Sequence, residues 1–534
     1  MRSSTKALLG AGTALAGTLL IGATALRAPA QPTQAAAPAA NTEGKAVYDR
    51  WCAGCHGETG HGDGVGATHL LPKPRDFTRA LYQVRSTATG EVPTDDDIRH
   101  VVDEGMPGTS MPAWKNTISS SERAAVVQYV KSFSNAFAQA PTRLTWGSDP
   151  GGGQAAIDSG RALYRQIQCF KCHGDAGRAD GPSAPTLKDD FNNPIRPADL
   201  SQNWMFNGGP TVEDIYHRLR TGLDGTPMPS FSDQVDAHVL TDGDLWRVAH
   251  YIRSLSPEEA PRVRDVVNAQ KTATLPSGPN DSAWSGVDRF YFPLVGQVIL
   301  KPRWFSPTVN GVWVQAVHDG QSLALRVTWH DPSQSPDSGV WRQWRGRMAR
   351  AMGSDDSGTA DTATSHPDRI LVQFPARQMS GSERPYFLLG STQQPVYLWR
   401  WESEPGAATE VLGSGADRLE PLPAQPDSVS ATGVYDHGEW RVQFVRTLAT
   451  ADSTNRLQFT AGHAIPMALF AWDGSNGETG TRMSVGSWVN IYLSEPSGAG
   501  TVVWPLLAML GTGGLGLLVV VRTQRTSANQ PSDK

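Results

Sequence analysis

The four cysteines of this 534-residue chain all lie in two short motifs, Cys52-Ala-Gly-Cys55-His56 and Cys169-Phe-Lys-Cys172-His173. A C-x-x-C-H run is the attachment signature of c-type haem. Two thiols at this spacing bond the vinyl groups of one porphyrin, and the imidazole that follows reaches the iron. A thioredoxin-like redox pair or half of a zinc site are competing interpretations. The predicted residues of two covalent haems are the thiols Cys52, Cys55, Cys169 and Cys172 and the axial ligands His56 and His173.

A repeated loop downstream of each motif supplies a second ligand for each iron. The loop reads GMPGTSMP at residues 105–112 and GLDGTPMP at residues 222–229. Met111 and Met228 each lie 55 residues after the histidine of their motif. Met106 aligns with a leucine, which cannot bind iron, so we assign Met111 and Met228 as the axial ligands. A thioether opposite imidazole raises the haem potential and closes the coordination sphere, which suits electron transfer better than oxygen or peroxide binding.

The repeat extends to the segments that must position these residues. A Gly-Lys/Arg-Ala-x-Tyr run precedes each motif. Ahead of each methionine loop, Thr94 and Thr211 are predicted N-caps of helices with acidic residues in their first turn. An amphipathic stretch ends each copy. Helix, haem loop, helix, methionine loop and final helix is the plan of class I cytochromes c. The chain therefore resembles two tandem c-type cytochrome domains over residues 41–137 and 153–257, and the resemblance implies two all-α folds.

The composition excludes several classes of function. Lys and Arg number 47 against 52 Asp and Glu, and the formal net charge of -5 does not favour nucleic-acid binding. Four cysteines in 534 residues exclude a disulfide-built scaffold. The glycine run 151–153 lacks a preceding strand and a P-loop lysine, so it is interpreted as a linker. No hydrolytic or transferase constellation emerges.

Residues 275–495 change from helical to strand periodicity. Gly311–Val317 and Leu323–Trp329 alternate around an Asp-Gly turn, which predicts a β-hairpin. Short strands between Gly, Pro and Asp turns predict an all-β, immunoglobulin-like sandwich. Long polar loops are expected at 331–366 and 402–427. Further strands are expected at 370–374, 386–389, 396–401, 429–435, 440–445, 467–472 and 487–493.

Five short runs in this region carry a family resemblance: VHDG at 317–320, PYFLLG at 385–390, WRW at 399–401, GEWRV at 438–442 and FAWDG at 470–474. Together they resemble the haem-binding γ subunit of ethylbenzene dehydrogenase and its relatives. Those subunits serve molybdenum enzymes of the dimethyl sulfoxide reductase type, among them chlorate and selenate reductases and nitrite oxidoreductases. The resemblance implies a sandwich that relays electrons through one b-type haem held between a methionine and a lysine.

The axial ligands that this resemblance implies are missing from the sequence. Leu389 stands in the segment of the methionine, and the lysine would align at Thr432 or Met483. No lysine occurs between Lys301 and the last residue of the chain. Whether this domain binds a b-type haem therefore stays open, and each alternative ligand also suits a structural role in the core, a turn or a strand. The alternative ligands are Met483 and His463, followed by Met379, Met467 and His318.

Both ends of the chain carry apolar stretches. A basic N-terminus and an apolar stretch up to Leu26 precede a small-residue cleavage site, which predicts a signal peptide over residues 1–30, with an uncleaved anchor as the alternative. Residues 501–521 carry no charge and would span about 31 Å as a helix, which matches a bilayer core of about 30 Å. Arg522 and Arg525 place the C-terminal end in the cytoplasm. We expect one C-terminal anchor in the cytoplasmic membrane, with the bulk of the protein on the periplasmic or outer side of that membrane.

The leading hypothesis is a membrane-anchored, extracytoplasmic dihaem cytochrome rather than an enzyme. It would carry electrons between a partner redox enzyme, of the molybdenum oxidoreductase type, and a respiratory-chain acceptor. A dihaem peroxidase-like enzyme is the first alternative, and a methionine at the same spacing in both copies argues against its open iron. A sandwich that binds carbohydrate is the second alternative. Its stacking residues would be Trp399, Trp401, Trp440, Trp472 and Trp488, which also suit a packed core.

Overall fold

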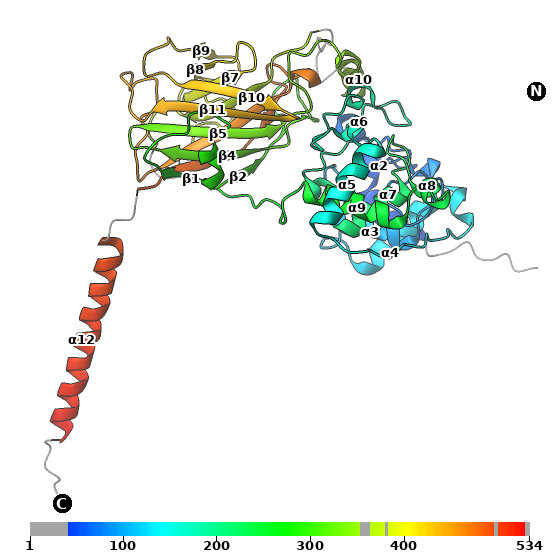
Figure 1. Ribbon diagram of the computed structural model, residues 1–534, viewed down its shortest axis with the longest axis horizontal. Helices are drawn as coiled ribbons and strands as arrows, with labels where there is room; N and C mark the ends of the chain where they lie inside the picture. The colour runs from blue at the N-terminus through cyan, green and yellow to red at the C-terminus, as the bar shows by residue number, and fades with distance from the viewer. Residues whose placement is uncertain (1–40, 353–363, 380–382, 496–499, 529–534) are drawn as a thin grey trace, which may run out of the picture.

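The computed structural model describes residues 41–352, 364–379, 383–495 and 500–528, and the predicted signal peptide lies outside this range (Figure 1). A helical part comes first, a β-sheet domain follows, and one long helix ends the described chain. This order confirms the predicted fold class, with two helical units, an all-β domain and a C-terminal apolar helix.

The helical part consists of two units with the same order of elements. Capping boxes begin the second and third long helices of each unit, for example where Thr94 and Thr211 exchange hydrogen bonds with Asp97 and Asp214. The first unit contains α1 (Asn41–Trp51), α2 (Ala53–His56), η1 (Ala67–His69), η2 (Phe77–Arg79), α3 (Asp95–Glu104), α4 (Ser120–Lys131) and η3 (Asn135–Ala138). The second contains α5 (Gln154–Gln166), α6 (Phe170–His173), η4 (Ala184–Thr186), η5 (Asn203–Met205), α7 (Val212–Thr221), α8 (Ser232–Asp236) and α9 (Asp242–Ser254).

The first and last helices of each unit cross at a glycine. A Cβ atom at Gly44 of α1 would lie 2.3 Å from the carbonyl oxygen of Ala125 in α4. At the matching position of the second unit, a Cβ atom at Gly160 would lie 2.0 Å from the carbonyl oxygen of Arg247 in α9. Only glycine permits this approach of two helix backbones. The crossing closes each core beneath the C-x-x-C-H motif.

The β domain is a 14-stranded sheet in which strand β1 joins two halves. Strand order along the main path is β10-β11-β5-β4-β1-β14-β12-β6-β7-β8-β9. β1 runs parallel to both β14 and β4, and the other pairings are antiparallel. The strands are β1 (Val266–Lys271), β2 (Phe290–Pro293), β3 (Val295–Gly296), β4 (Gly311–His318), β5 (Ser322–His330), β6 (Arg369–Pro375), β7 (Val396–Glu402), β8 (Ala408–Gly413), β9 (Leu419–Pro421), β10 (Ser430–Asp436), β11 (Glu439–Thr447), β12 (Ala464–Trp472), β13 (Ser484–Val485) and β14 (Val489–Leu493), with helices η6 (Ser282–Gly286), α10 (Arg342–Met352) and η7 (Gly474–Asn476) between them.

Side chains from the two halves of the sheet pack into one core. The ring centroids of Trp329 on β5 and Trp401 on β7 lie 6.2 Å apart, and those of Trp399 on β7 and Phe444 on β11 lie 5.9 Å apart. These residues belong to one buried cluster with apolar side chains of β4, β6 and β12. The sheet therefore closes on itself as a sandwich, as the strand periodicity predicted.

Three expected elements of this domain are corrected by the structure. The apolar run 386–389 is a turn rather than a strand, with Leu389 at a left-handed φ of 63°. The expected loop 331–366 contains α10, which buries Trp344 and Met348. The expected loop 402–427 contains β8 and β9, because Val411 and its neighbours pair with β7. In each case a tertiary contact overrides the local pattern.

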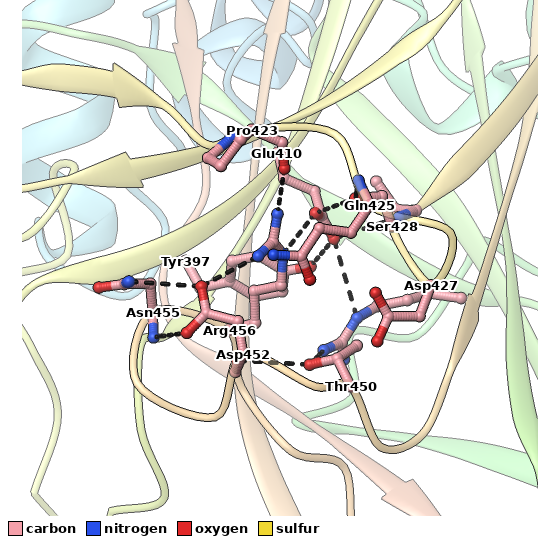
Figure 2. Close-up of polar contacts among 12 residues, drawn as sticks. Tyr397, Glu410, Pro423, Gln425, Asp427, Ser428, Thr450, Asp452, Asn455 and Arg456 are labelled. Carbon is pink, nitrogen blue, oxygen red and sulfur yellow. Dashed lines mark hydrogen bonds and ion pairs between the residues drawn. The ribbon is translucent and has the colours of Figure 1, made fainter.

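A buried ion network holds the long connections on one side of the sandwich (Figure 2). Glu410 on β8 accepts hydrogen bonds from Arg456, 2.7 Å away, and from Tyr397 on β7. Arg456 also pairs with Asp452 at 2.9 Å. Both members of the Glu410–Arg456 pair are almost completely buried. The network therefore ties the segments around residues 428 and 452 to the sheet.

The last described helix, α12 (Gly500–Ala528), extends away from the β domain (Figure 1). Its segment Val503–Arg525 is apolar, with a mean hydropathy of 1.9, and no part of that segment is buried against the protein. Among the described residues it is the one helix that is long and apolar enough to cross a membrane.

Candidate functional site

Each C-x-x-C-H motif forms a single helical turn that ends at its histidine. The backbone N–H of His56 donates to the carbonyl of Cys52, and that of His173 donates to the carbonyl of Cys169, both at 2.9 Å. The four cysteines all lie among the described residues, and none of them forms a disulfide. Burial raises the pKa of Cys52 and of Cys169 to about 12. Each motif thus brings two thiols and one imidazole together within one helical turn.

Both motif histidines are held by the same kind of hydrogen bond. The Nδ1 atom of His56 lies 3.1 Å from the carbonyl oxygen of Arg75, and that of His173 lies 2.9 Å from the carbonyl oxygen of Ala198. A carbonyl only accepts, so Nδ1 carries the proton and Nε2 keeps a lone pair for a metal. Burial also lowers the pKa of both imidazoles, which keeps them neutral. Both rings are therefore in the form that binds iron.

A tyrosine from the preceding helix fixes the end of each motif. The hydroxyl of Tyr48 donates to the carbonyl of Gly57 at 2.7 Å, and that of Tyr164 donates to the carbonyl of Gly174 at 2.6 Å. Both tyrosines are buried, and both glycines follow a motif histidine with positive φ. The repeated sequence contained these tyrosines, but their role as supports emerges only from the structure.

The two methionine loops share one backbone geometry. The N–H groups of Met106 and Leu223 donate to the carbonyls of Met111 and Met228, each at 3.1 Å. In both loops a threonine hydroxyl accepts from the N–H of the predicted ligand, Thr109 from Met111 and Thr226 from Met228. This equivalence supports the alignment of Met111 with Met228. Met228 also packs against the same buried core as Cys169.

The residues of each unit fit a covalently attached haem. The donor set in each copy is two free thiols, one imidazole with an available Nε2 and one thioether on the repeated loop. Imidazole and thioether are the ligand types that hold the iron of cytochromes c.

The two helical units meet through a buried arginine. Arg85 of the first unit is completely buried and donates to Asp224 at 2.8 Å and to the carbonyl of Thr221 at 2.6 Å. In return, Arg218 of α7 donates to the carbonyl of Arg85 at 2.8 Å. Asp224 belongs to the loop that carries Met228, so the second methionine loop lies directly against the first unit.

The second unit is joined to the β domain next to its motif histidine. Asp199, which follows Ala198 in the chain, lies 2.5 Å from Nδ1 of His330 at the end of β5. Burial opposes a charge on His330, but Asp199 and Glu439 outweigh it and raise the pKa of His330 to about 9. Burial likewise opposes the charge on Glu439, whose pKa His330 and Arg178 lower to about 2. The contact is therefore a network of charged groups at neutral pH.

A cluster of tryptophans fills the junction of all three folded parts. Trp304, Trp341 and Trp344 of the β domain pack with Ala184 of the second unit and Leu71 of the first. Figure 1 shows α10, which carries Trp344, beside the helical part. Ala184 follows the second haem motif closely in the chain, and Leu71 follows the first. The junction therefore fixes both motifs relative to the β domain.

Met483 and His463, the first two alternative b-haem ligands, lie far apart. Met483 is completely buried and aligned with the end of β12, whereas His463 is exposed just before its start. The intervening strand of nine residues spans roughly 30 Å. Met467 lies in the sandwich core, and Nε2 of His318 lies 2.8 Å from the carbonyl of Ser494. Leu389 occupies the position of the family methionine inside a second buried apolar cluster.

The tryptophans considered for sugar stacking are mostly enclosed. Trp399, Trp401, Trp440 and Trp472 are at most 3% exposed, and Trp488 is partly exposed. An enclosed ring has no face available for a sugar. Their role is core packing.

Two family models match different parts of the chain. The family described as cytochrome c oxidase, cbb3-type, subunit III matches residues 39–130 and again residues 155–252. The family described as ethylbenzene dehydrogenase matches residues 281–420. The two resemblances seen in the sequence are therefore confirmed, each on its own part of the chain.

Three individual relatives each match part of this chain. A Haloferax mediterranei protein assigned as respiratory nitrate reductase heme subunit ORF7 is 25% identical over 265 residues, which cover 48% of this chain and 82% of that protein. The cbb3-type cytochrome c oxidase subunit FixP of Sinorhizobium medicae is 29% identical over 109 residues, 19% of this chain and 31% of that protein. Among solved structures, a chain of the reducing HAO-like protein complex of Kuenenia stuttgartiensis is 42% identical and covers 40% of this chain and 96% of its own length, with a TM-score of 0.38.

Proposed function

From a chain that joins two cytochrome c domains to a domain of the ethylbenzene dehydrogenase family, we propose a membrane-anchored dihaem cytochrome that passes electrons to or from a partner redox enzyme. That the chain is a haem-containing electron-transfer cytochrome follows from its two domain families. The proposal has three finer parts: the covalent attachment of two haems, the side of the membrane on which the folded domains lie, and the type of partner enzyme.

The observation that carries the proposal is the duplicated site. Both motif histidines donate from Nδ1 to a backbone carbonyl, and both methionine loops share their hydrogen bonds. When bound, the haem supplies reversible one-electron exchange at its iron. The chain's residues attach it through Cys52, Cys55, Cys169 and Cys172, orient one imidazole each and offer a methionine as the second ligand. Such a closed iron suits electron transfer.

The β domain is proposed to dock the partner. It holds the second cytochrome domain through the His330 network and the tryptophan junction, so the two haem motifs keep fixed positions relative to it. The match to ethylbenzene dehydrogenase and the name of the Haloferax relative support a redox enzyme of the molybdenum type. A b-type haem in the sandwich is not part of the proposal, because its family ligands are absent.

The membrane arrangement is proposed from both ends of the chain. The helix segment Val503–Arg525 would be the anchor, with Arg522 and Arg525 on the cytoplasmic side. The predicted signal peptide then places the folded domains on the extracytoplasmic side. Electrons would therefore move within the periplasm or its equivalent.

The proposal is tested by a spectroscopic redox titration of the purified full-length protein. We expect two reversible one-electron transitions per chain, no carbon monoxide binding by the reduced protein and no peroxide turnover. An iron that binds carbon monoxide together with measurable peroxide turnover would support the peroxidase-like alternative. Absence of any haem transition would contradict both.

A further inference from the structure

Three buried aspartates meet where the two halves of the sandwich close. Asp331 directly follows β5, Asp368 directly precedes β6, and Asp473 directly follows β12. One carboxylate oxygen from each lies within 4.8 Å of the others, and all three residues are completely buried. The pairing of Trp472 with Arg369 across β12 and β6 places Asp473 and Asp368 side by side. The haem sites do not use this cluster.

The charges of this cluster are poorly balanced by protein groups. Arg196 of the second cytochrome domain lies 3.2 Å from Oδ2 of Asp473, and no other cationic side chain in the described ranges forms an ion pair with the three aspartates. Three carboxylates and one guanidinium leave two negative charges. Glu478, which accepts from the N–H of Asp473 at 3.0 Å, adds a further acidic group. Asp368 and Asp473 also accept hydrogen bonds from backbone N–H groups, which lower the cost of burial but supply no full positive charge. Buried carboxylates without a counter-charge are strongly disfavoured, so protons or a cation must neutralise them.

Unpartnered oxygen atoms line the same place. The Oδ2 atom of Asp331 is buried and has no hydrogen-bond partner among the described residues, although its Oδ1 atom accepts from the N–H of Ser333. The hydroxyls of Ser333 and Ser335 are also buried without partners in this part of the structure. Ser335 contacts the cluster directly, because its N–H donates to Asp368 at 2.7 Å. A buried acceptor of this kind, close to two other carboxylates, is a place where a proton or a cation would bind.

We propose that Asp331, Asp368 and Asp473 bind a calcium ion. All available donors are oxygens, which selects a hard cation over zinc or copper. The three aspartates and Arg196 leave two uncompensated negative charges, which match a divalent ion. Calcium accepts six to eight oxygen ligands in irregular arrangements, whereas magnesium requires a near-ideal octahedron. Burial and mutual repulsion raise the pKa of Asp331 and of Asp368 well above the usual range, which is the condition that a bound cation would relieve.

The position of the ion gives it a structural role at a domain boundary. Arg196, which pairs with Asp473, also lies over the rings of Trp341 and Trp344 in the tryptophan junction. The ion would therefore stabilise both the closed end of the sandwich and the interface between the β domain and the second cytochrome domain. This role is independent of the electron-transfer proposal, because no haem ligand takes part.

The test is calcium binding by the full-length, detergent-solubilised protein. After dialysis against EGTA, calcium is added and its content is measured by plasma mass spectrometry, with thermal unfolding followed in parallel. We expect about one calcium per chain and a melting temperature that rises steadily with the logarithm of calcium concentration, as mass action requires. Magnesium at the same concentration should raise it much less. An equal response to magnesium would overturn the assignment to calcium.

Variants separate this site from adventitious binding. Asp331→Asn and Asp368→Asn keep the side-chain shape and remove one charge each, so both should lose the bound calcium and the calcium-dependent shift. Asp417→Asn, at an exposed position of the same domain, should keep both. If a site variant does not fold, the melting temperatures of the unchanged protein in EGTA and in calcium still test the proposal. Equal melting temperatures in EGTA and calcium, or a full calcium response in Asp331→Asn, would overturn the proposal.

Discussion

A single hydrogen bond fixes the ring of each motif histidine, the proposed iron ligand. Both rings donate from Nδ1 to a backbone carbonyl, that of Arg75 for His56 and that of Ala198 for His173. Both carbonyls belong to segments that contact a neighbouring domain. Arg75 is half-buried against the second cytochrome domain, and Ala198 precedes Asp199 of the His330 network. The support of each ligand is therefore part of an interface.

The methionine assignment predicts the outcome of three substitutions. Met111→Leu and Met228→Leu should each lower the midpoint potential of one haem and open one iron to carbon monoxide, because leucine cannot ligate. Met106→Leu, the matched control, should change neither property, since leucine already occupies that position in the second loop. Redox titration and carbon monoxide difference spectra measure the effect. A lowered potential in Met106→Leu alone would reverse the assignment in the first domain.

Glu410→Gln should destabilise the β domain by about 3–5 kcal/mol, because Arg446 would stay buried without this carboxylate and Arg456 would keep only Asp452. Hydrogen bonds from Tyr397 and Arg456 outweigh burial and lower the pKa of Glu410 below its usual 4.5. Its stabilisation is therefore complete above about pH 4.5 and is lost as pH falls through the folded pKa. Denaturant unfolding followed by tryptophan fluorescence measures both effects. Glu420→Gln, on exposed β9, serves as the control and should match the unchanged protein.

Among the elements, those with a strong local signal could be predicted and those that depend on tertiary contacts could not. Alternation predicted β4 and β5, and the repeat predicted the helical units. The run 386–389 is apolar, yet the side chain of Gln373 bonds both Phe387 and Leu389 and holds a turn. Helix α10 is polar over much of its length, and the tryptophan junction is what fixes it. No local pattern carries that information.

The helix crossing in the second cytochrome domain gives a prediction for one glycine. Gly160→Ala would place a Cβ atom 2.0 Å from the backbone of α9, so the helices must separate. Overpacking of this kind costs about 1–3 kcal/mol. Gly243→Ala, whose Cβ would have no neighbour closer than 3.6 Å, is the control in the same helix pair. Thermal unfolding should show a lower midpoint for the first variant, and equal midpoints would contradict the crossing.

At the scale of the whole molecule, the sequence reveals residues that share one short motif more readily than residues that meet only in the folded chain. The proposed haem residues carry a local signal, because porphyrin geometry dictates the spacing of thiols and histidine. The pair Arg85–Asp224 and the pair His330–Asp199 join residues more than a hundred positions apart, and only the assembled fold brings them together. The aspartate cluster is hidden in the sequence for the same reason, since its members sit at the ends of three separate strands.

The contact between the cytochrome domains can be weakened selectively. Arg85→Gln should leave Asp224 buried without its cation, at a cost of about 3–5 kcal/mol. Limited proteolysis of the linker after residue 138 should then accelerate, because the two domains separate more often. Arg143→Gln breaks an exposed pair with Asp96 and should cost about 0–1 kcal/mol. Equal proteolysis rates for the two variants would show that the buried pair does not hold the domains together.

The central claim is that the four cysteines attach two haems, and covalent haem content tests it most directly. The protein is denatured, extracted with acidic acetone to remove unattached haem, and measured as the pyridine haemochrome per chain. We predict two haems of the c type in the full-length protein and one after Cys169→Ser with Cys172→Ser. A protein that retains no haem after extraction would contradict the account.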